Sequence, residues 1–206
     1  ISKDLVPILL HDDILDRTTT GKGFPTDFNY EDIKKLDAGL FFYNYSTKIY
    51  IPTLKEVLLF CKKNGISLNI ELKPNYGFEN ISVDAVAKLI KSFNFTNQFY
   101  FSSFDWDSII LMKNLLPNAN YGLLINKFNQ NISLKNAIDI CNKFNFFSCG
   151  FNIKIINSIV ISEMKTNNLI TTVYSEKNLK PYEAKELWLN GVNSIFIDDP
   201  SKFKIF

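Results

Sequence analysis

Two short stretches of this sequence place chemically capable side chains directly after apolar segments. His11 follows an apolar run and precedes Asp12 and Asp13. Glu71 and Lys73 are separated by one residue, so on a strand both side chains point to the same face. An imidazole transfers protons near neutral pH, carboxylates bind hard divalent cations, and an ammonium group neutralises phosphoryl charge. These residue types predict chemistry on a phosphate ester, and a satisfied ion pair is the alternative for Glu71 and Lys73.

His11 is the only histidine in the chain, and Arg17 is the only arginine in a chain otherwise rich in lysine. A guanidinium group forms planar, bidentate pairs that lysine cannot reproduce. We therefore expect Arg17 to hold its loop in place through Asp12, Asp16 or backbone carbonyls rather than to take part in catalysis. A lone histidine is as readily structural as catalytic, and its place at the end of an apolar run leaves both roles open.

The composition is that of a globular domain of 206 residues, with 46% hydrophobic residues and a net charge of +2. No basic patch suggests a nucleic-acid partner, and no apolar run reaches the roughly 18 residues of a transmembrane helix. The three cysteines show no CxxC spacing, which argues against a zinc site or a disulfide framework. The composition favours a cytoplasmic location, with a periplasmic one as the alternative, and it leaves the oligomeric state open.

The apolar runs alternate with amphipathic segments. Seven strands are predicted, at residues 6–11, 66–72, 98–103, 120–125, 146–151, 169–174 and 193–198. Six helices are predicted between them, at residues 53–64, 80–93, 105–115, 133–144, 156–167 and 180–190. Continuously apolar strands are typical of parallel sheets covered on both faces. The pattern favours an α/β fold of the (β/α)₈ TIM-barrel type over a doubly wound open sheet, because no glycine-rich phosphate loop is present.

Residues 12–52 interrupt this rhythm between the first predicted strand and its helix. The segment is rich in threonine, aspartate and aromatic residues, with one short helical turn predicted at 30–36. A long insertion at the carboxyl end of a barrel strand lies over the mouth of the active site. We therefore expect one domain over residues 1–206, with residues 12–52 as an inserted cap.

Several segments resemble motifs of the bacterial glycerophosphodiester phosphodiesterase family. The first 23 residues, ISKDLVPILLHDDILDRTTTGKG, resemble the strand and loop that carry the family's HD and RTT motifs. Further resemblances follow in the family's order, in KKLDAGLFF, IPTLKEVL, LNIELKP, FSSFDWDSI and GVNSIFIDDP. The match extends over almost the whole chain.

The resemblance implies a TIM-type barrel that hydrolyses glycerophosphodiesters to sn-glycerol 3-phosphate and an alcohol. It implies a divalent cation, Ca²⁺ or Mg²⁺, as the cofactor. His11 would be the general acid on the leaving alkoxide, Glu71 a metal ligand, and Lys73 the residue that holds the phosphate during catalysis. Phe104 would contact the substrate, and the segment 12–52 would cover the glycerol.

The sequence also departs from the family pattern. The family's HRG, ENT and E-x-D motifs are not found in it, so we expect that a first strand, a first helix and most of a second strand are missing from the barrel. Such a chain would keep one acid/base group and one carboxylate ligand, with Asp12, Asp13 and Asp198 as candidate substitutes, and we expect it to be inactive in isolation. The alternatives are a non-catalytic barrel relic or binding module, and a phospholipase-like phosphodiesterase on the same scaffold.

Overall fold

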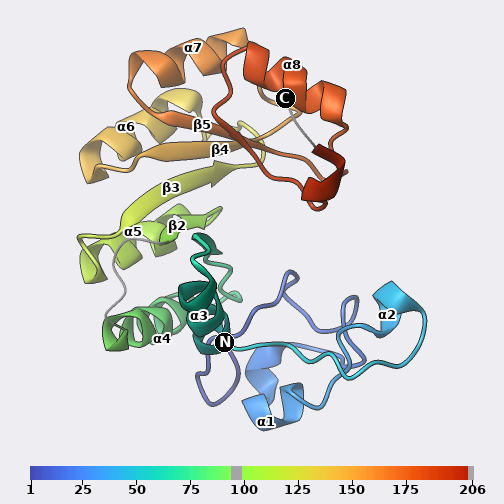
Figure 1. The fold of residues 1–206 in the computed structure, drawn as a ribbon. Helices are drawn as coiled ribbons and strands as arrows, with labels where there is room; N and C mark the ends of the chain where they lie inside the picture. Colours follow the sequence, from blue (N-terminus) through green and yellow to red (C-terminus); the bar gives the residue numbers. More distant parts are fainter. Residues whose placement is uncertain (94–98, 204–206) are drawn as a thin grey trace. The chain divides into compact units, whose positions relative to one another are not determined.

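The computed structural model describes residues 1–93 and 99–203. The chain forms two compact units, the first from residues 1–99 and 110–119 and the second from residues 100–109 and 120–206. Figure 1 shows the elements of both in chain order. Among the described residues, no helix is long and apolar enough to cross a lipid bilayer.

The second unit contains a parallel sheet. Its strands are β2 (Phe99–Ser103), β3 (Asn120–Ile125), β4 (Ser148–Asn152), β5 (Ile170–Tyr174) and β6 (Ser194–Ile195), with the first residue of β2 assigned to the first unit. Neighbours pair in parallel and in chain order, in a register that places Phe101 beside Tyr121 and Cys149 beside Thr171. Each of the strands β2 to β5 is followed by an α-helix, as βα units require, and β6 is followed by a 3-10 turn at Pro200–Phe203.

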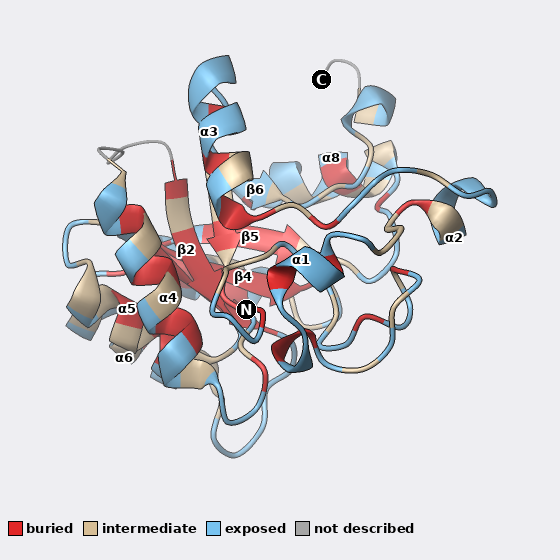
Figure 2. Cartoon of the chain, turned by 90° about the horizontal axis from the view of Figure 1, so that it is seen from below, coloured by how far each residue is buried: buried red, intermediate tan, exposed pale blue. Residues whose placement is uncertain are grey.

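Helices α6 (Leu134–Phe144), α7 (Ser158–Thr166) and α8 (Pro181–Leu189) lie together along one side of strands β3–β5 (Figure 1). A fourth helix, α5 (Trp106–Leu115), begins in the second unit and ends in the first. Every residue of β4 is buried, and Figure 2 shows β4 and most of β5 in the colour of buried residues. Residues 121–125 of β3 are all buried, which explains why its apolar run is continuous rather than alternating.

The first unit holds the strand β1 (Leu68–Glu71) between α3 (Leu54–Asn64) and α4 (Glu79–Ser92). Thr53 caps α3 by accepting the N–H of Glu56 at 3.1 Å, and the Glu56 carboxylate accepts the N–H of Thr53 at 2.8 Å. Gly65 ends the helix in the left-handed conformation, at φ 66°. Both helix signals in the sequence are therefore confirmed.

Residues 12–52 contain little regular structure, as expected of an insertion. Three short pieces occur, a 3-10 turn at Pro25–Asp27, α1 (Tyr30–Ile33) and α2 (Leu40–Tyr43). A small hydrophobic core holds the segment together, formed by Leu15, Tyr30, Ile33 and Ile51. The segment is thus ordered by packing rather than by backbone ladders.

The predicted strand at 6–11 is wrong for the described structure. Ile8 forms only an isolated antiparallel bridge with Thr53, supported by hydrogen bonds from Leu9 N–H to the Pro52 carbonyl and from Leu54 N–H to the Pro7 carbonyl. A strand needs a ladder of paired backbone groups, and here the pairing stops after one bridge. The remaining strand and helix predictions are confirmed in position, except that three elements are shorter than predicted: β1 against 66–72, β6 against 193–198 and α1 against 30–36. Residue 98 lies outside the described residues.

Candidate active site

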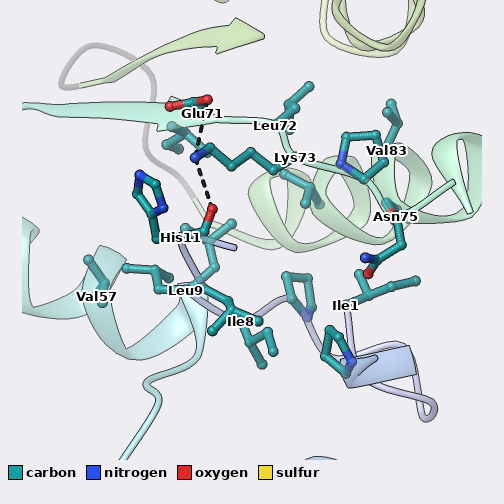
Figure 3. Close-up of a pocket in the computed structure, with 18 of the residues that line it drawn as sticks. Ile1, Ile8, Leu9, His11, Val57, Glu71, Leu72, Lys73, Asn75 and Val83 are labelled. Atoms are coloured by element: carbon teal, nitrogen blue, oxygen red, sulfur yellow. Dashed lines mark hydrogen bonds and ion pairs between the residues drawn. The ribbon is translucent and has the colours of Figure 1, made fainter. Parts of the chain in front are cut away.

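A cavity of about 410 Å³ lies in the first unit (Figure 3). Its wall is mostly apolar and comes from residues 7–10, α3, β1 and α4. Seven polar side chains share this lining: His11, Asp12, Asn69, Glu71, Lys73, Asn75 and Ser82. A concave, mainly apolar space with a few convergent polar groups is the usual form of a small-molecule site.

The strand β1 and the residues after it position the charged pair. Lys73 lies two residues beyond Glu71, and its Nζ is 3.6 Å from Glu71 Oε1. The same ammonium group donates a hydrogen bond of 3.0 Å to the backbone carbonyl of His11 (Figure 3). Lys73 therefore joins the end of β1 to the segment that carries the histidine.

Asn75 makes a second connection between these two segments. Its side chain is buried, and its Nδ2 donates a hydrogen bond of 2.8 Å to the carbonyl of Asp13. The bonds from Lys73 and Asn75 reach the carbonyls on either side of Asp12. Two such anchors fix the backbone around His11 relative to β1. Sequence reasoning missed Asn75, although a polar residue just after a strand end was a usable signal.

His11, Asp12 and Arg17 form a cluster of hydrogen bonds. Arg17 Nε donates to Asp12 Oδ2 at 2.6 Å and Arg17 Nη2 to Asp12 Oδ1 at 2.5 Å, the bidentate geometry that only arginine offers. His11 Nδ1 lies 2.7 Å from Asp12 Oδ1 and 3.4 Å from Arg17 Nη2. A ring nitrogen cannot donate and accept at once, and the shorter contact with the carboxylate favours Nδ1–H as the donor.

The electrostatics of this cluster follow from its contacts. Arg17 first and His11 second hold the pKa of the Asp12 carboxyl well below its usual range. The pairing with Asp12 also raises the pKa of the Arg17 guanidinium. Asp12 is therefore ionised at neutral pH and able to orient the histidine ring. The His11 side chain itself is 76% exposed, so solvent or a substrate reaches it.

Glu71 has the opposite environment. Burial raises the pKa of its carboxyl group, and the nearby Lys73 offsets only part of that shift. Its Oε1 is buried and accepts no hydrogen bond among the described residues, with Lys73 at ion-pair distance only. A buried oxygen without a hydrogen bond is costly unless another group binds it. Such an oxygen fits one position in the coordination shell of a hard divalent cation.

A complete metal site is not assembled by the described residues. No group of three or more histidine, cysteine, aspartate or glutamate side chains gathers anywhere in the two described ranges. Calcium and magnesium prefer six or more oxygen ligands, waters included. Glu71 therefore fits as one ligand of such an ion.

The structure thus brings five of the predicted site residues together in the first unit: His11, Asp12, Arg17, Glu71 and Lys73. Phe104 belongs to the second unit, where its ring packs edge-on against Tyr174 with the centroids 5.5 Å apart. The Phe104 side chain is half-exposed. Its contact with a substrate stays a prediction.

The chain belongs to the glycerophosphoryl diester phosphodiesterase family, whose pattern matches residues 1–202. This match confirms the family that the sequence motifs resemble.

Named relatives agree with this assignment. The glycerophosphodiester phosphodiesterase of Caldanaerobacter subterraneus subsp. tengcongensis is 37% identical over 124 residues, which cover 60% of this chain and 51% of that protein. The glycerophosphodiester phosphodiesterase of Bacillus altitudinis is 29% identical over 211 residues, covering 98% of this chain and 81% of that protein. The matches thus span about half the length of the first relative and about four fifths of the second.

Solved structures share the fold. A phosphodiesterase of Oleispira antarctica, in complex with the product sn-glycerol-3-phosphate, matches with a TM-score of 0.87 at 25% identity, covering 99% of this chain and 80% of that one. A glycerophosphodiester phosphodiesterase of Agrobacterium tumefaciens strain C58 matches in fold, with a TM-score of 0.77 at 20% identity and coverage of 98% and 82%. The predicted α/β class is confirmed, and closure into an eight-stranded barrel stays a prediction.

Proposed function

We propose that the rim of this cavity binds the phosphodiester of a glycerophosphodiester, and that the protein takes part in its hydrolysis to sn-glycerol 3-phosphate and an alcohol. The observation that carries the proposal is the meeting of Lys73, Glu71 and the His11 segment at one cavity, in a chain of this family. In the reaction, water adds to phosphorus and releases one proton to solvent, the bond from phosphorus to the alcohol oxygen breaks, and that oxygen takes up one proton.

We assign the proton to His11. Asp12 accepts the Nδ1–H of the ring, so Nε2 is the nitrogen that can reach a substrate. When the ring is protonated, Nε2–H can donate to the departing alkoxide, as a general acid does. The Asp12 carboxylate stabilises the protonated ring and fixes its tautomer, and Arg17 in turn holds Asp12 in place.

We assign phosphate binding to Lys73 and metal binding to Glu71. The Lys73 ammonium group has three N–H donors, and Glu71 and the His11 carbonyl are its partners among the described residues, so a further donor can bind a phosphate oxygen. Glu71 offers its buried oxygen to a divalent cation, Ca²⁺ or Mg²⁺. When bound, such a cation neutralises negative charge on the phosphoryl oxygens.

We further propose that residues 12–52 form a cap next to this rim, and that the protein functions in the cytoplasm. The small core around Leu15 and Ile33 keeps the cap ordered. All three cysteines are unpaired and buried, which agrees with a reducing compartment.

Product binding tests the proposal without requiring turnover. Titration of the chain with sn-glycerol 3-phosphate, in the presence of Mg²⁺ or Ca²⁺, should give saturable heat and shift the NMR signal of the lone histidine, His11. Lys73→Gln should weaken binding about tenfold or more, because a charge-assisted contact is lost. Lys22→Gln removes an exposed lysine outside the cavity lining and should leave the affinity unchanged.

Turnover is the second measurement. With Glu71 as the one assigned metal ligand and His11 as the one assigned acid/base group, we expect the 206-residue chain to release no detectable glycerol 3-phosphate from glycerophosphocholine. Metal-dependent release would overturn the expected inactivity while supporting the assigned reaction. If the product does not bind, or if Lys73→Gln and Lys22→Gln lose the same affinity for it, the assignment of phosphate binding to Lys73 is wrong. Lysophospholipid and sphingomyelin serve as alternative substrates. Hydrolysis of these two substrates alone would favour the alternative hypothesis of a phospholipase-like phosphodiesterase.

A further inference from the structure

Two cysteine thiols lie in contact inside the second unit. Cys141 is on the last turn of α6, Cys149 is on β4, and their Sγ atoms are 3.4 Å apart. Both side chains are fully buried, and neither lines the cavity of the first unit. The third cysteine, Cys61, belongs to the first unit. The spacing of Cys141 and Cys149 is unlike CxxC, so only the fold brings their sulfurs together.

The short connection between α6 and β4 holds the two cysteines in place. Asn145 ends α6 in the left-handed conformation, at φ 54°, and its N–H donates to the Cys141 carbonyl. The N–H of Phe146 donates to the same carbonyl at 2.8 Å. Cys149 lies in the middle of β4, beside Thr171 of β5 in the parallel register. Hydrogen bonds therefore hold both backbones, and the contact between the thiols belongs to the folded state.

A disulfide between these sulfurs requires only a small movement. An S–S bond is about 2.05 Å long, so the two Sγ atoms must approach by about 1.4 Å. Cys141 is on the last turn of a helix, and such a turn opens locally more readily than a buried strand does. Opening of this turn moves the Cys141 sulfur while β4 stays paired, and it admits a small oxidant to the two thiols.

The environment of the pair keeps it reduced in the absence of an oxidant. The contact with Cys141 first and burial second raise the pKa of the Cys149 thiol. A thiol of this kind is protonated at neutral pH, and the thiolate is the reactive form of cysteine. The pair is therefore protected from casual modification, and its reaction depends on the neighbouring sulfur.

We propose that Cys141 and Cys149 form a reversible oxidative crosslink between α6 and β4, with hydrogen peroxide as the oxidant. In the first step, one cysteine sulfur attacks a peroxide oxygen, the O–O bond breaks, and a sulfenic acid and water form. In the second step, the other sulfur attacks the sulfenic sulfur, the S–O bond breaks, and a second water leaves. The two thiols lose two electrons and two protons, and the peroxide gains both. A dithiol restores the two thiols by exchange.

Peptide mapping of the full chain tests the crosslink. The chain is treated with hydrogen peroxide, isolated as a monomer, unfolded with iodoacetamide and digested with trypsin. Lys143 lies between the two cysteines, so cleavage after it separates their peptides unless a disulfide joins them. We expect joined peptides that separate after reduction with dithiothreitol, and we expect Cys61 in a separate, unlinked peptide. Separate Cys141 and Cys149 peptides before reduction would overturn the proposal, as would a link from Cys61 to either cysteine.

Matched variants and thermal unfolding show whether the bond forms in the folded chain. Cys61→Ser should crosslink like the unaltered chain, whereas Cys141→Ser and Cys149→Ser should give no linked peptides, with circular dichroism as the check on folding. The crosslink should raise the Tm by about 5 °C, because it restricts the unfolded chain, and dithiothreitol should reverse the rise. An unchanged Tm in the linked chain would overturn the tie between α6 and β4. The thiols take no part in product binding at the rim, so a failure here leaves the assigned reaction standing.

Discussion

The sheet of the second unit and the cavity rim of the first unit differ in how their polar groups are satisfied. In β3, β4 and β5, the backbone groups pair in a regular ladder, and Phe151 and Val173 are fully buried. At the rim, side chains pair with one another and with carbonyls of a distant segment, and one oxygen of Glu71 accepts no hydrogen bond among the described residues. The sheet contributes stability, whereas the rim keeps polar groups available for a ligand at some cost in stability.

The largest expected effect is a cavity in the sheet. Phe151→Ala removes a fully buried ring from β4 and should lower the free energy of unfolding by about 3–5 kcal/mol, measured by urea denaturation. Phe42→Ala removes a ring that is 81% exposed and should change it by less than about 0.5 kcal/mol. Similar losses in both variants would mean that the burial contrast between the regions does not control stability.

Helix caps compare the two units with matched chemistry. Thr53→Ala in the first unit should cost about 1–2 kcal/mol, because the cap also donates from its hydroxyl to the Glu56 carboxylate at 2.8 Å. Ser133→Ala at the start of α6 removes one accepted N–H bond, from Asn136 at 3.1 Å, and should cost about 0.5–1 kcal/mol. Thermal or urea unfolding measures the loss of stability in each variant. A larger loss in Ser133→Ala than in Thr53→Ala would show that the capping box adds nothing.

Glu71→Gln should stabilise the fold slightly at pH 7. Burial raises the pKa of Glu71, so the folded state binds its proton more tightly than the unfolded chain. The cost of burying the ionised Glu71 carboxylate is fully present above its pKa in the folded state. It is absent below its pKa in the unfolded chain, about 4.3. The gain from the substitution should therefore shrink as the pH falls. A loss of stability at pH 7 would show instead that the pair with Lys73 outweighs burial.

The smallest effect concerns Arg17, which is mostly exposed. Arg17→Gln should raise the pKa of Asp12 toward the usual range for aspartate, since Arg17 is the main cause of its depression. Arg17→Lys should restore only part of that depression, because lysine cannot donate both hydrogen bonds. Carboxyl NMR titration of Asp12 measures the change. An unchanged Asp12 pKa in Arg17→Gln would contradict the bidentate pairing.

Local signals in the sequence predicted most of the secondary structure. The Thr53 and Glu56 pair and Gly65 marked both ends of α3, and the apolar run 120–125 coincides with β3. These signals are reliable because a helix cap is a contact between residues three or four positions apart, and an apolar run indicates burial whichever elements cover it. The strand at 6–11 failed because a strand also depends on a partner, and Ile8 pairs only with Thr53.

Long-range contacts at the rim could not be predicted in the same way. The sequence left Asp12, Asp16 and backbone carbonyls open as partners of Arg17. The structure pairs Arg17 with Asp12, while Asp16 accepts the N–H of Gly23 at 2.8 Å. Asn75 was missed because its role depends on the Asp13 carbonyl, which lies 62 residues away in the sequence.

The sequence by itself determined the α/β class, the family, and the residue types available for phosphate chemistry, because these depend on local patterns and on motifs in order. Only the tertiary structure decided which of those groups meet. Folding brings Lys73 to the His11 carbonyl and leaves the Glu71 oxygen buried without a hydrogen bond among the described residues. Burial and hydrogen bonding are properties of the packed chain, and they turn a list of capable residues into a site.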